Sequence, residues 1–188
     1  MKLPGADRTK RTGPLRLLDA WALLAISLLL HSGCAFAHRV PQALEVPPGH
    51  RVFLNAHALG VQIYVSRTAS SNEATLRWEL KGPEAMLFDD CGKVIGSHYA
   101  GPTWESRHDG SKVIVTVLQR ASAPNSSAIP WLSLHGMSAN QSGAFAPATF
   151  IQRVNTTGGL APAAAPTSLG EEARVTYTAD YIFYHAKP

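Results

Sequence analysis

Three stretches of the chain carry more hydrogen-bonding side chains than a purely structural segment requires. They span residues 57–64, 96–105 and 151–159, and each mixes polar side chains with glycine or aromatic residues. Such a mixture is typical of concave sites, in which a few polar groups orient a ligand against apolar walls. We therefore predict one ligand site, to which these stretches contribute His57, Gln62, His98, Trp104, Glu105, Gln152, Arg153 and Asn155.

Trp104 and Glu105 are the pair in this set with the clearest binding chemistry. An aromatic face beside a carboxylate suits a sugar ring or a cation. The same carboxylate could instead act as a general acid or base with His98 or His57. This second arrangement is the catalytic alternative, a hydrolase.

Arg153 lies in a predicted strand, and an inward-pointing arginine needs either a carboxylate partner or an anionic ligand. We expect the carboxylate partner, in an ion pair with Glu105 that holds two strands together. We also expect three buried indole rings whose N–H groups find hydrogen-bond partners, those of Trp78, Trp104 and Trp131.

Metal and thiol chemistry have little support in the residue spacing. The candidate ligands His57, His98, His108, His135 and His185 form no H-x-H pair and no H-E-x-x-H motif. We predict neither a metal site nor a cofactor. Cys91 follows Asp89 and Asp90, which would raise the pKa of its thiol and oppose a nucleophilic pair with His98. We expect Cys91 to be buried as a small hydrophobic residue.

The elements that must position these residues are predicted to be β-strands. Beyond residue 50, apolar and polar residues alternate, and no segment shows a helical period. Asp-rich and Asp-Gly turns at 89–93 and 107–111 predict hairpins. We therefore predict an all-β fold, a single antiparallel β-sandwich or barrel-like domain of about nine to ten short strands. The expected strands cover residues 52–54, 61–65, 75–80, 85–88, 94–99, 103–105, 112–118, 129–134, 148–154 and 174–185.

The N-terminal segment is typical of a secretory signal peptide. Basic residues precede an apolar run at 20–30, and Ala35-Phe36-Ala37 then forms an A-x-A cleavage site. We predict a signal peptide over residues 1–37 and a single secreted β domain over residues 38–188. Within the domain we expect an extended segment at 38–49, where three prolines oppose a helix, and a long loop at 156–172.

Cys34 leaves a second targeting route open. Ser32-Gly33-Cys34 resembles the end of a bacterial lipoprotein box, but His31 stands where an aliphatic residue is expected. We expect an exported protein, periplasmic or extracellular, that is held at a membrane only if it is lipidated at Cys34.

The composition is that of a globular domain, with 45% hydrophobic and 16% charged residues. The formal net charge of the whole chain is +4. Five of the 17 Lys and Arg residues and two of the 13 Asp and Glu residues lie in the leader, so the remaining net charge is about +1. No basic patch is left to bind nucleic acid, and we expect no such partner.

Several motifs resemble a known family. They are GHRVFL at 49–54, HALGVQIY at 57–64, HYAGPTWE at 98–105, IPWL at 129–132, IQRVNTTGGLAP at 151–162 and YTADY at 177–181. On these segments the chain resembles the secreted bacterial and fungal proteins of domain-of-unknown-function family 3455, over roughly residues 45–185. The family has no established activity, so the resemblance implies an exported compartment and the extent of the domain.

The chain departs from that family at two places. Relatives commonly carry one cysteine just after the Gln-Ile-Tyr strand and another after the Gly-Gly-Leu-Ala-Pro segment. Here Ser66 stands at the first place, and residues 163–170 contain no cysteine at the second. The resemblance therefore implies a missing disulfide, which would have tied the long loop to the sheet. We predict that residues 156–172 are the least ordered internal segment.

These features together favour a non-catalytic binding or structural module. A carbohydrate, another small polar ligand or an envelope component would bind near His98, Trp104, Glu105 and Gln152. The alternatives are a secreted hydrolase that uses Glu105 with His98 or His57, and a purely structural envelope protein. Convergence of the side chains on one cavity would favour a site, whereas separate pairwise contacts would favour a structural role.

Overall fold

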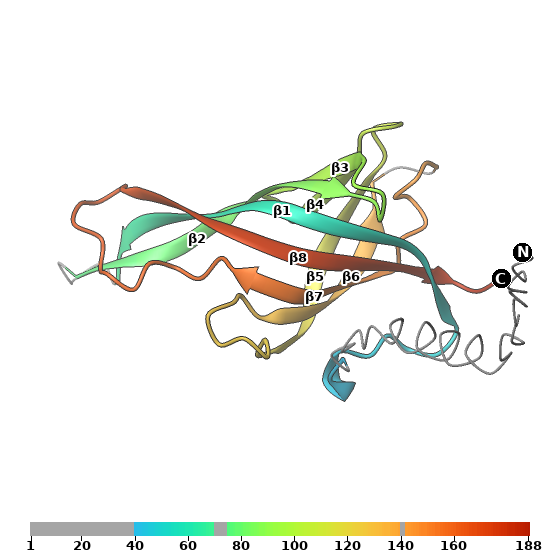
Figure 1. Ribbon diagram of the computed structural model, residues 1–188, viewed down its shortest axis with the longest axis horizontal. Coiled ribbons are helices and arrows are strands. Elements are labelled where there is room, and N and C mark those ends of the chain that lie inside the picture. Colours follow the sequence, from blue (N-terminus) through green and yellow to red (C-terminus); the bar gives the residue numbers. More distant parts are fainter. Residues whose placement is uncertain (1–39, 70–74, 140–141) are drawn as a thin grey trace, which may run out of the picture. The chain divides into compact units, whose positions relative to one another are not determined.

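The computed structural model describes residues 40–69, 75–139 and 142–188 (Figure 1). The described residues form one compact unit. The predicted signal peptide, with Cys34, lies outside the described residues. Within the described ranges, no helix is long and apolar enough to cross a membrane.

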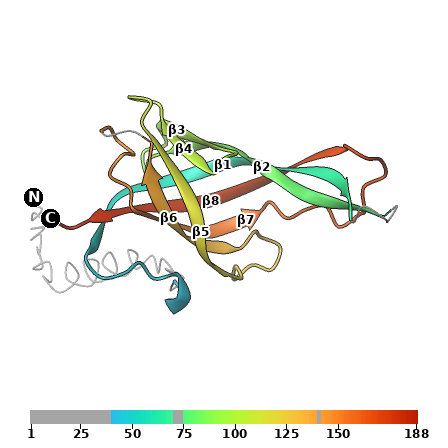
Figure 2. The same ribbon diagram turned by 180° about the vertical axis from the view of Figure 1, so that it is seen from behind.

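Antiparallel strands form one sheet that closes on itself as a barrel (Figure 1). Each strand pairs with the next along the chain, and β8 pairs back with β1; Figure 2 shows the closed sheet from behind. The all-β, barrel-like prediction is confirmed, and closure gives each of these strands a partner on both sides over at least part of its length. The strands are β1 (His50–Thr68), β2 (Leu76–Phe88), β3 (Val94–Tyr99), β4 (Thr103–Ser106), β5 (Lys112–Ala121), β6 (Trp131–Ser138), β7 (Phe150–Gly158) and β8 (Glu172–Ala186).

The barrel has eight strands rather than the expected nine to ten, because two pairs of predicted strands are continuous. Segments 52–54 and 61–65 both belong to β1, and 75–80 and 85–88 both belong to β2. Gly60 does not end β1. Its missing side chain lets β1 approach β2 closely, since a Cβ there would lie 2.1 Å from the Glu84 carbonyl oxygen. Pro83 is tolerated in β2 because pairing with β3 begins only at Glu84.

Small residues on β1 face large aromatic residues of β8 inside the barrel. Ala56 is paired with Tyr181 and Gly60 with Tyr177. Both tyrosines and Ala56 are at most 1% exposed. This alternation of small and large residues fills the tapering interior of a small barrel. It also brings the Tyr177 and Tyr181 hydroxyls into the interior, away from bulk water.

A short 3-10 helix, η1 (Gln42–Leu44), interrupts the segment for which the sequence predicts an extended conformation. It follows Pro41, whose fixed φ is compatible with the start of a helical turn. Leu44 is fully buried in a small outer cluster with Trp131 and Val154. The segment before β1 therefore covers part of the outer face of the barrel.

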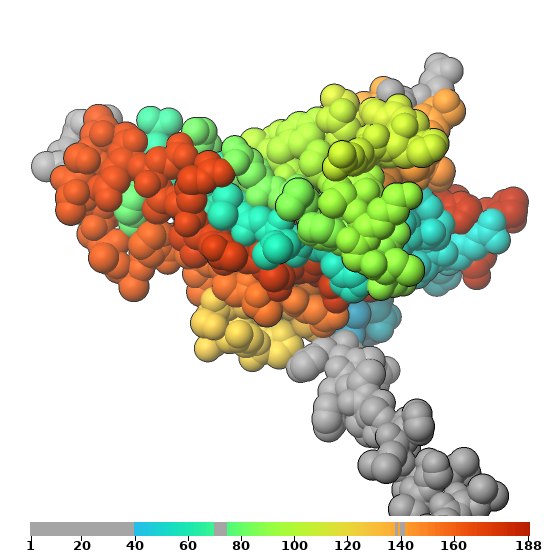
Figure 3. Space-filling model, turned by 45° about the horizontal axis from the view of Figure 1, so that its top comes forward, coloured from blue at the N-terminus to red at the C-terminus, as the bar shows by residue number. Residues whose placement is uncertain are grey.

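The long loop between β7 and β8 is bound to the sheet at several points, and Figure 3 shows it lying against β1 and β2. The indole N–H of Trp78 donates to the Ala164 carbonyl at 2.9 Å. The Ser66 hydroxyl donates to the Ser168 carbonyl, and the Ser66 N–H donates to the Glu171 carbonyl at 2.8 Å. Ser66 thus joins loop and sheet where the family resemblance implies a disulfide. That this loop is the least ordered internal segment stays a prediction.

Candidate functional site

A cavity of about 150 Å³ lies at one end of the barrel, beside the β3–β4 turn. All eight strands contribute to its walls, because their inward-facing residues converge there. Leu80 and Val117 keep 53% and 41% of their surface exposed and form its mouth. The lining residues are Gln62, Leu80, Pro83, His98, Pro102, Trp104, Val115, Val117, Arg120, Leu132, Leu134, Arg153 and Tyr181.

The structure brings half of the predicted site residues together. Gln62, His98, Trp104 and Arg153 line the cavity. The other four, His57, Glu105, Gln152 and Asn155, have partners outside it. The two-residue period of a strand explains the split, because adjacent residues point to opposite faces of the sheet. With Trp104 and Arg153 facing inward, Glu105 and Gln152 must face outward.

His98, Trp104 and Tyr181 form an aromatic cluster at the cavity. His98 stacks on Trp104 with ring centroids 3.9 Å apart, and Tyr181 meets both rings edge-on at 5.3 and 5.1 Å. The Nδ1 of His98 donates to the Thr103 carbonyl at 2.9 Å, because a carbonyl oxygen can only accept. Burial lowers the pKa of His98 to about 3, and the nearby charge of Arg153 acts in the same direction. His98 is therefore neutral at neutral pH.

Buried donor groups around the cavity lack protein partners. The amide nitrogen of Gln62, the indole nitrogen of Trp104 and the hydroxyls of Tyr177 and Tyr181 form no hydrogen bond of normal length among the described residues. The two hydroxyls interact only at longer range, with each other and, for Tyr181, with Arg153. Each of these side chains is at most 2% exposed. A buried polar group without a partner costs about 1–3 kcal/mol, so such groups call for an explanation. Of the four, Gln62, Trp104 and Tyr181 belong to residues that line the cavity, so these three are the candidates to donate a hydrogen bond to a ligand.

The predicted environment of the tryptophans is correct only in part. Trp104 and Trp131 are buried as expected, at 2% exposure each. Trp78 is half-buried and reaches the β7–β8 loop instead of the core. The Trp104 indole N–H, expected to be bonded, has no partner among the described residues.

The guanidinium of Arg153 enters the barrel without a carboxylate. Its Nε and Nη2 donate to the Pro130 carbonyl at 3.1 and 2.8 Å. Burial raises the pKa of Tyr64 and of Tyr181, and the positive charge of Arg153 opposes both shifts. The expected Arg153–Glu105 ion pair is wrong, because the two side chains leave the sheet on opposite faces.

Glu105 belongs to a group on the outer surface of the barrel. The Tyr99 hydroxyl donates to its Oε2 at 2.7 Å, and the Nζ of Lys112 lies 3.3 Å from the same oxygen. Both contacts favour the charged form and lower the pKa of Glu105, with the Tyr99 bond contributing most. Since His98 faces the interior, Glu105 cannot share a proton with it.

His57 and Asn155 meet at a separate surface cluster. The Nδ1 of His57 lies 2.7 Å from Asp180, and its Nε2 lies 3.1 Å from Asp90. The hydrogen bond with Asp180 is the main cause of a raised pKa for His57. The Asn155 amide donates to the second oxygen of Asp180 at 2.8 Å. These contacts fasten β1, β7 and β8 together on the outside and include no residue of the cavity.

Gln152 supports the segment before β1. Its amide nitrogen donates to the Leu44 carbonyl at 2.6 Å, and its amide oxygen accepts from the Tyr184 hydroxyl at 2.7 Å. Gln152 is only 3% exposed, so both polar ends of the amide are buried and paired. Its contacts tie η1 to the barrel wall.

Cys91 is exposed, contrary to the expectation that it would be buried. It lies in the β2–β3 turn, where Asp89 accepts a hydrogen bond from the Cys91 N–H at 3.0 Å. Turn residues at such a tip face solvent. In the part of the chain that the structure describes, no group of three or more His, Cys, Asp or Glu side chains is arranged to hold a metal ion.

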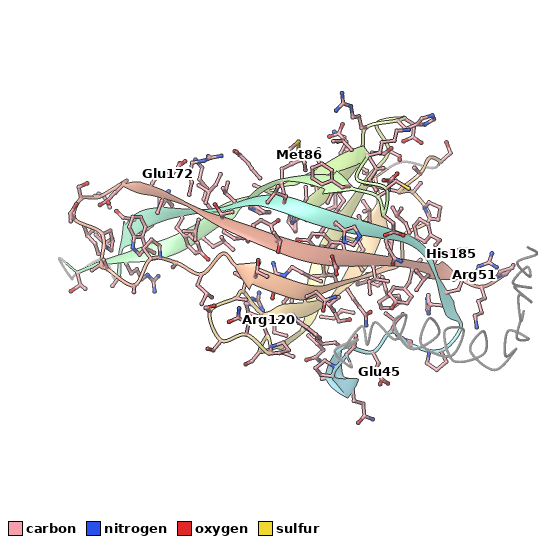
Figure 4. All side chains as sticks on the ribbon, in the orientation of Figure 1. Glu45, Arg51, Met86, Arg120, Glu172 and His185 are labelled. Atoms are coloured by element: carbon pink, nitrogen blue, oxygen red, sulfur yellow. The ribbon has the colours of Figure 1, made fainter. Side chains whose placement is uncertain are left out.

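Sequence reasoning missed Tyr177, Tyr181 and Arg120 as residues of the interior and of the cavity mouth. Tyr177 and Tyr181 lie four residues apart in one strand, so the two-residue period puts them on the same face. The spacing of the two tyrosines could therefore have indicated that both face the same side of the sheet. Arg120 is exposed near the end of β5 (Figure 4), and its place at the mouth depends on barrel closure.

Comparison with known proteins identifies the domain but not its activity. A family model described as "Protein of unknown function (DUF3455)" matches residues 47–185. No curated protein and no solved structure gives a significant match. The matched region contains nearly the whole barrel, from just before β1 to the end of β8. On this match, and in agreement with the motifs that resemble it, the chain belongs to the DUF3455 family.

Proposed function

We propose that this domain is a non-catalytic binding module that holds a small polar ligand in the cavity at the barrel end. The observation that carries the proposal is the set of buried donors on Gln62, Trp104 and Tyr181, which line one cavity and have no partner among the described residues. A ligand that accepts hydrogen bonds would offset the cost of burying them.

The arrangement of charged groups argues against the hydrolase alternative. No Asp or Glu lines the cavity, so the carboxylate that would serve as general acid or base is absent there. His98, with a pKa of about 3, is a weak base at neutral pH. Glu105 and His57 each lie in outer-surface clusters with other partners. Binding without catalysis is therefore the better reading of these contacts.

The proposal extends to the cellular location. The basic and apolar N-terminal segment with its A-x-A site favours export, so the ligand would be met in the periplasm or outside the cell. Attachment to a membrane would require lipidation at Cys34.

Intrinsic tryptophan fluorescence of the full chain tests the binding proposal. Small polar compounds are titrated in, and a ligand in the cavity is expected to change the emission of Trp104. The change should disappear in Trp104→Phe and persist in Trp78→Phe, since Trp78 contacts the β7–β8 loop instead. A fluorescence change that survives Trp104→Phe would place the ligand elsewhere and contradict the proposal.

A further inference from the structure

The ionised groups at the barrel-end cavity all carry the same sign. Arg153 lines its interior and Arg120 its mouth, while His98 is neutral and no carboxylate contributes to the wall. Among the described residues, neither arginine forms an ion pair with Asp or Glu. A charge enclosed by apolar walls is costly without a counter-charge. The cavity therefore favours an anion over a neutral or cationic ligand.

Arg153 retains the donors that suit a carboxylate. Its Nε and Nη2 bond to one carbonyl oxygen, that of Pro130, and among the described residues neither Nη1 nor the second N–H of Nη2 forms a further hydrogen bond of normal length. These N–H groups form the end of the guanidinium fork, which matches the two oxygens of a carboxylate. Tyr181, whose hydroxyl interacts with Arg153, adds a further donor beside it.

The other unpaired groups are also hydrogen-bond donors. Gln62 and Trp104 present N–H groups, and an indole N–H can only donate. Sugar hydroxyls donate as well as accept, and no Asp or Glu lines this cavity to accept from them. A carboxylate accepts only, and it can use several of these donors together.

The rest of the wall is apolar, and its size limits the ligand. Val115, Leu132 and Leu134 line the cavity together with the stacked rings of His98 and Trp104. An apolar cavity of about 150 Å³ holds one benzene molecule, and that is also the volume here. The ligand body should therefore be about one six-membered ring, without long chains.

We propose that the cavity binds a small organic acid, with its carboxylate on Arg153 and Tyr181 and a single apolar ring against Val115 and Leu134. The inference rests on the proposed binding function and adds the chemical class of the ligand. Benzoate is the simplest probe that has both parts.

Isothermal titration of the full chain with matched probes tests this inference. Benzoate supplies ring and charge, benzamide the ring without the charge, inorganic phosphate the charge without the ring, and glucose neither. We expect benzoate to bind at least about tenfold more tightly than benzamide, because its hydrogen bonds to Arg153 are charge-assisted. Phosphate and glucose should bind more weakly still.

Each of the other outcomes would overturn a defined part of the proposal. Equal or tighter binding of benzamide or glucose, sensitive to Trp104→Phe, would overturn the carboxylate and leave the binding function standing. Tighter binding of phosphate would overturn the apolar ring. If none of the four probes binds, both the ligand class and the proposed function are overturned.

Variants at two arginines locate the charge that matters. Arg153→Met should remove the preference for benzoate over benzamide, and Arg153→Lys should reduce it, because an ammonium lacks the planar fork. Arg174→Met is the matched control, since Arg174 pairs with Glu84 and Glu172 on the outer surface. A preference that persists in both Arg153 variants would overturn the inference. If Arg153→Met fails to fold, the lysine variant and the four-probe comparison on the unaltered chain still decide it.

Discussion

Two buried glutamines offer a sharp test of whether the cavity donors are unpaired. Gln62 and Gln152 are 2% and 3% exposed, but only Gln152 is hydrogen bonded, to the Leu44 carbonyl and the Tyr184 hydroxyl. The Gln62 amide nitrogen has no partner among the described residues. Replacing each by Met keeps the side-chain length and removes the amide. The two substitutions should therefore change the free energy of unfolding in opposite directions.

The magnitudes follow from the contacts. Gln152→Met removes two hydrogen bonds of about 1 kcal/mol each and leaves the buried Leu44 carbonyl and the half-buried Tyr184 hydroxyl without these partners, so a loss of about 2 kcal/mol is expected. Gln62→Met removes an unpaired amide whose burial costs about 1–3 kcal/mol, so a gain of about 1 kcal/mol is expected. For a domain of this size, each kcal/mol corresponds to roughly 2–4 °C in Tm.

Urea denaturation of both variants and the unaltered chain measures these changes. The midpoint should rise for Gln62→Met and fall for Gln152→Met, with the slope unchanged. Benzoate binding should weaken in Gln62→Met although the protein is more stable, as expected when a site keeps polar groups at a cost in stability. The reasoning is refuted if Gln62→Met destabilises the protein as much as Gln152→Met does.

Three further predictions concern pH, the loop and the closure of the sheet. Because the pKa of His98 is about 3 in the folded protein and about 6.5 when unfolded, acidification from pH 6.5 to about pH 3 should lower the free energy of unfolding by on the order of 1 kcal/mol per pH unit, and His98→Gln should flatten this dependence in denaturation curves. Ser66→Ala should lower the Tm by an amount that corresponds to about 1 kcal/mol, because it removes the hydroxyl that donates to the Ser168 carbonyl; an unchanged Tm would contradict the importance of this contact. Gly60→Ala should cost more than about 2 kcal/mol, because its Cβ would meet the Glu84 carbonyl at 2.1 Å, and a folded variant of unchanged midpoint would argue against this strand approach.

The strands could be predicted from the sequence because their signal is local. Alternation of apolar and polar residues predicted at least part of each strand, and the turn at Asp109-Gly110 was predicted from its own residues, although β6 and β7 extend beyond the predicted segments and β7 takes the first residues of the predicted loop at 156–172. The continuity of β1 through Gly60 and of β2 through Pro83 depends on partner strands, so local signals broke both strands. Closure of the barrel by pairing of β8 with β1 joins residues far apart in the sequence, so no local sequence pattern predicts it.

The two-residue period of a strand could also have predicted that only part of the candidate site faces one cavity. Neighbours in a strand face opposite ways, so Trp104 and Glu105 could not both enter one cavity, nor could Gln152 and Arg153. Which member of each pair faces inward is set by barrel closure and by η1, which covers the Gln152 side. Whether these donors have hydrogen-bond partners depends on three-dimensional packing, so it could not be predicted from the residue types alone.

The most direct test of the account is the indole N–H signal of Trp104 in a two-dimensional NMR spectrum of the labelled chain during a benzoate titration. The Trp104 signal should shift and saturate, because the indole ring lines the cavity and its N–H lacks a partner among the described residues. The Trp78 signal, whose N–H is bonded to the Ala164 carbonyl, should stay in place. If the Trp104 signal stays fixed through the titration, or if both signals shift alike, the barrel-end cavity is not a binding site for this class of ligand.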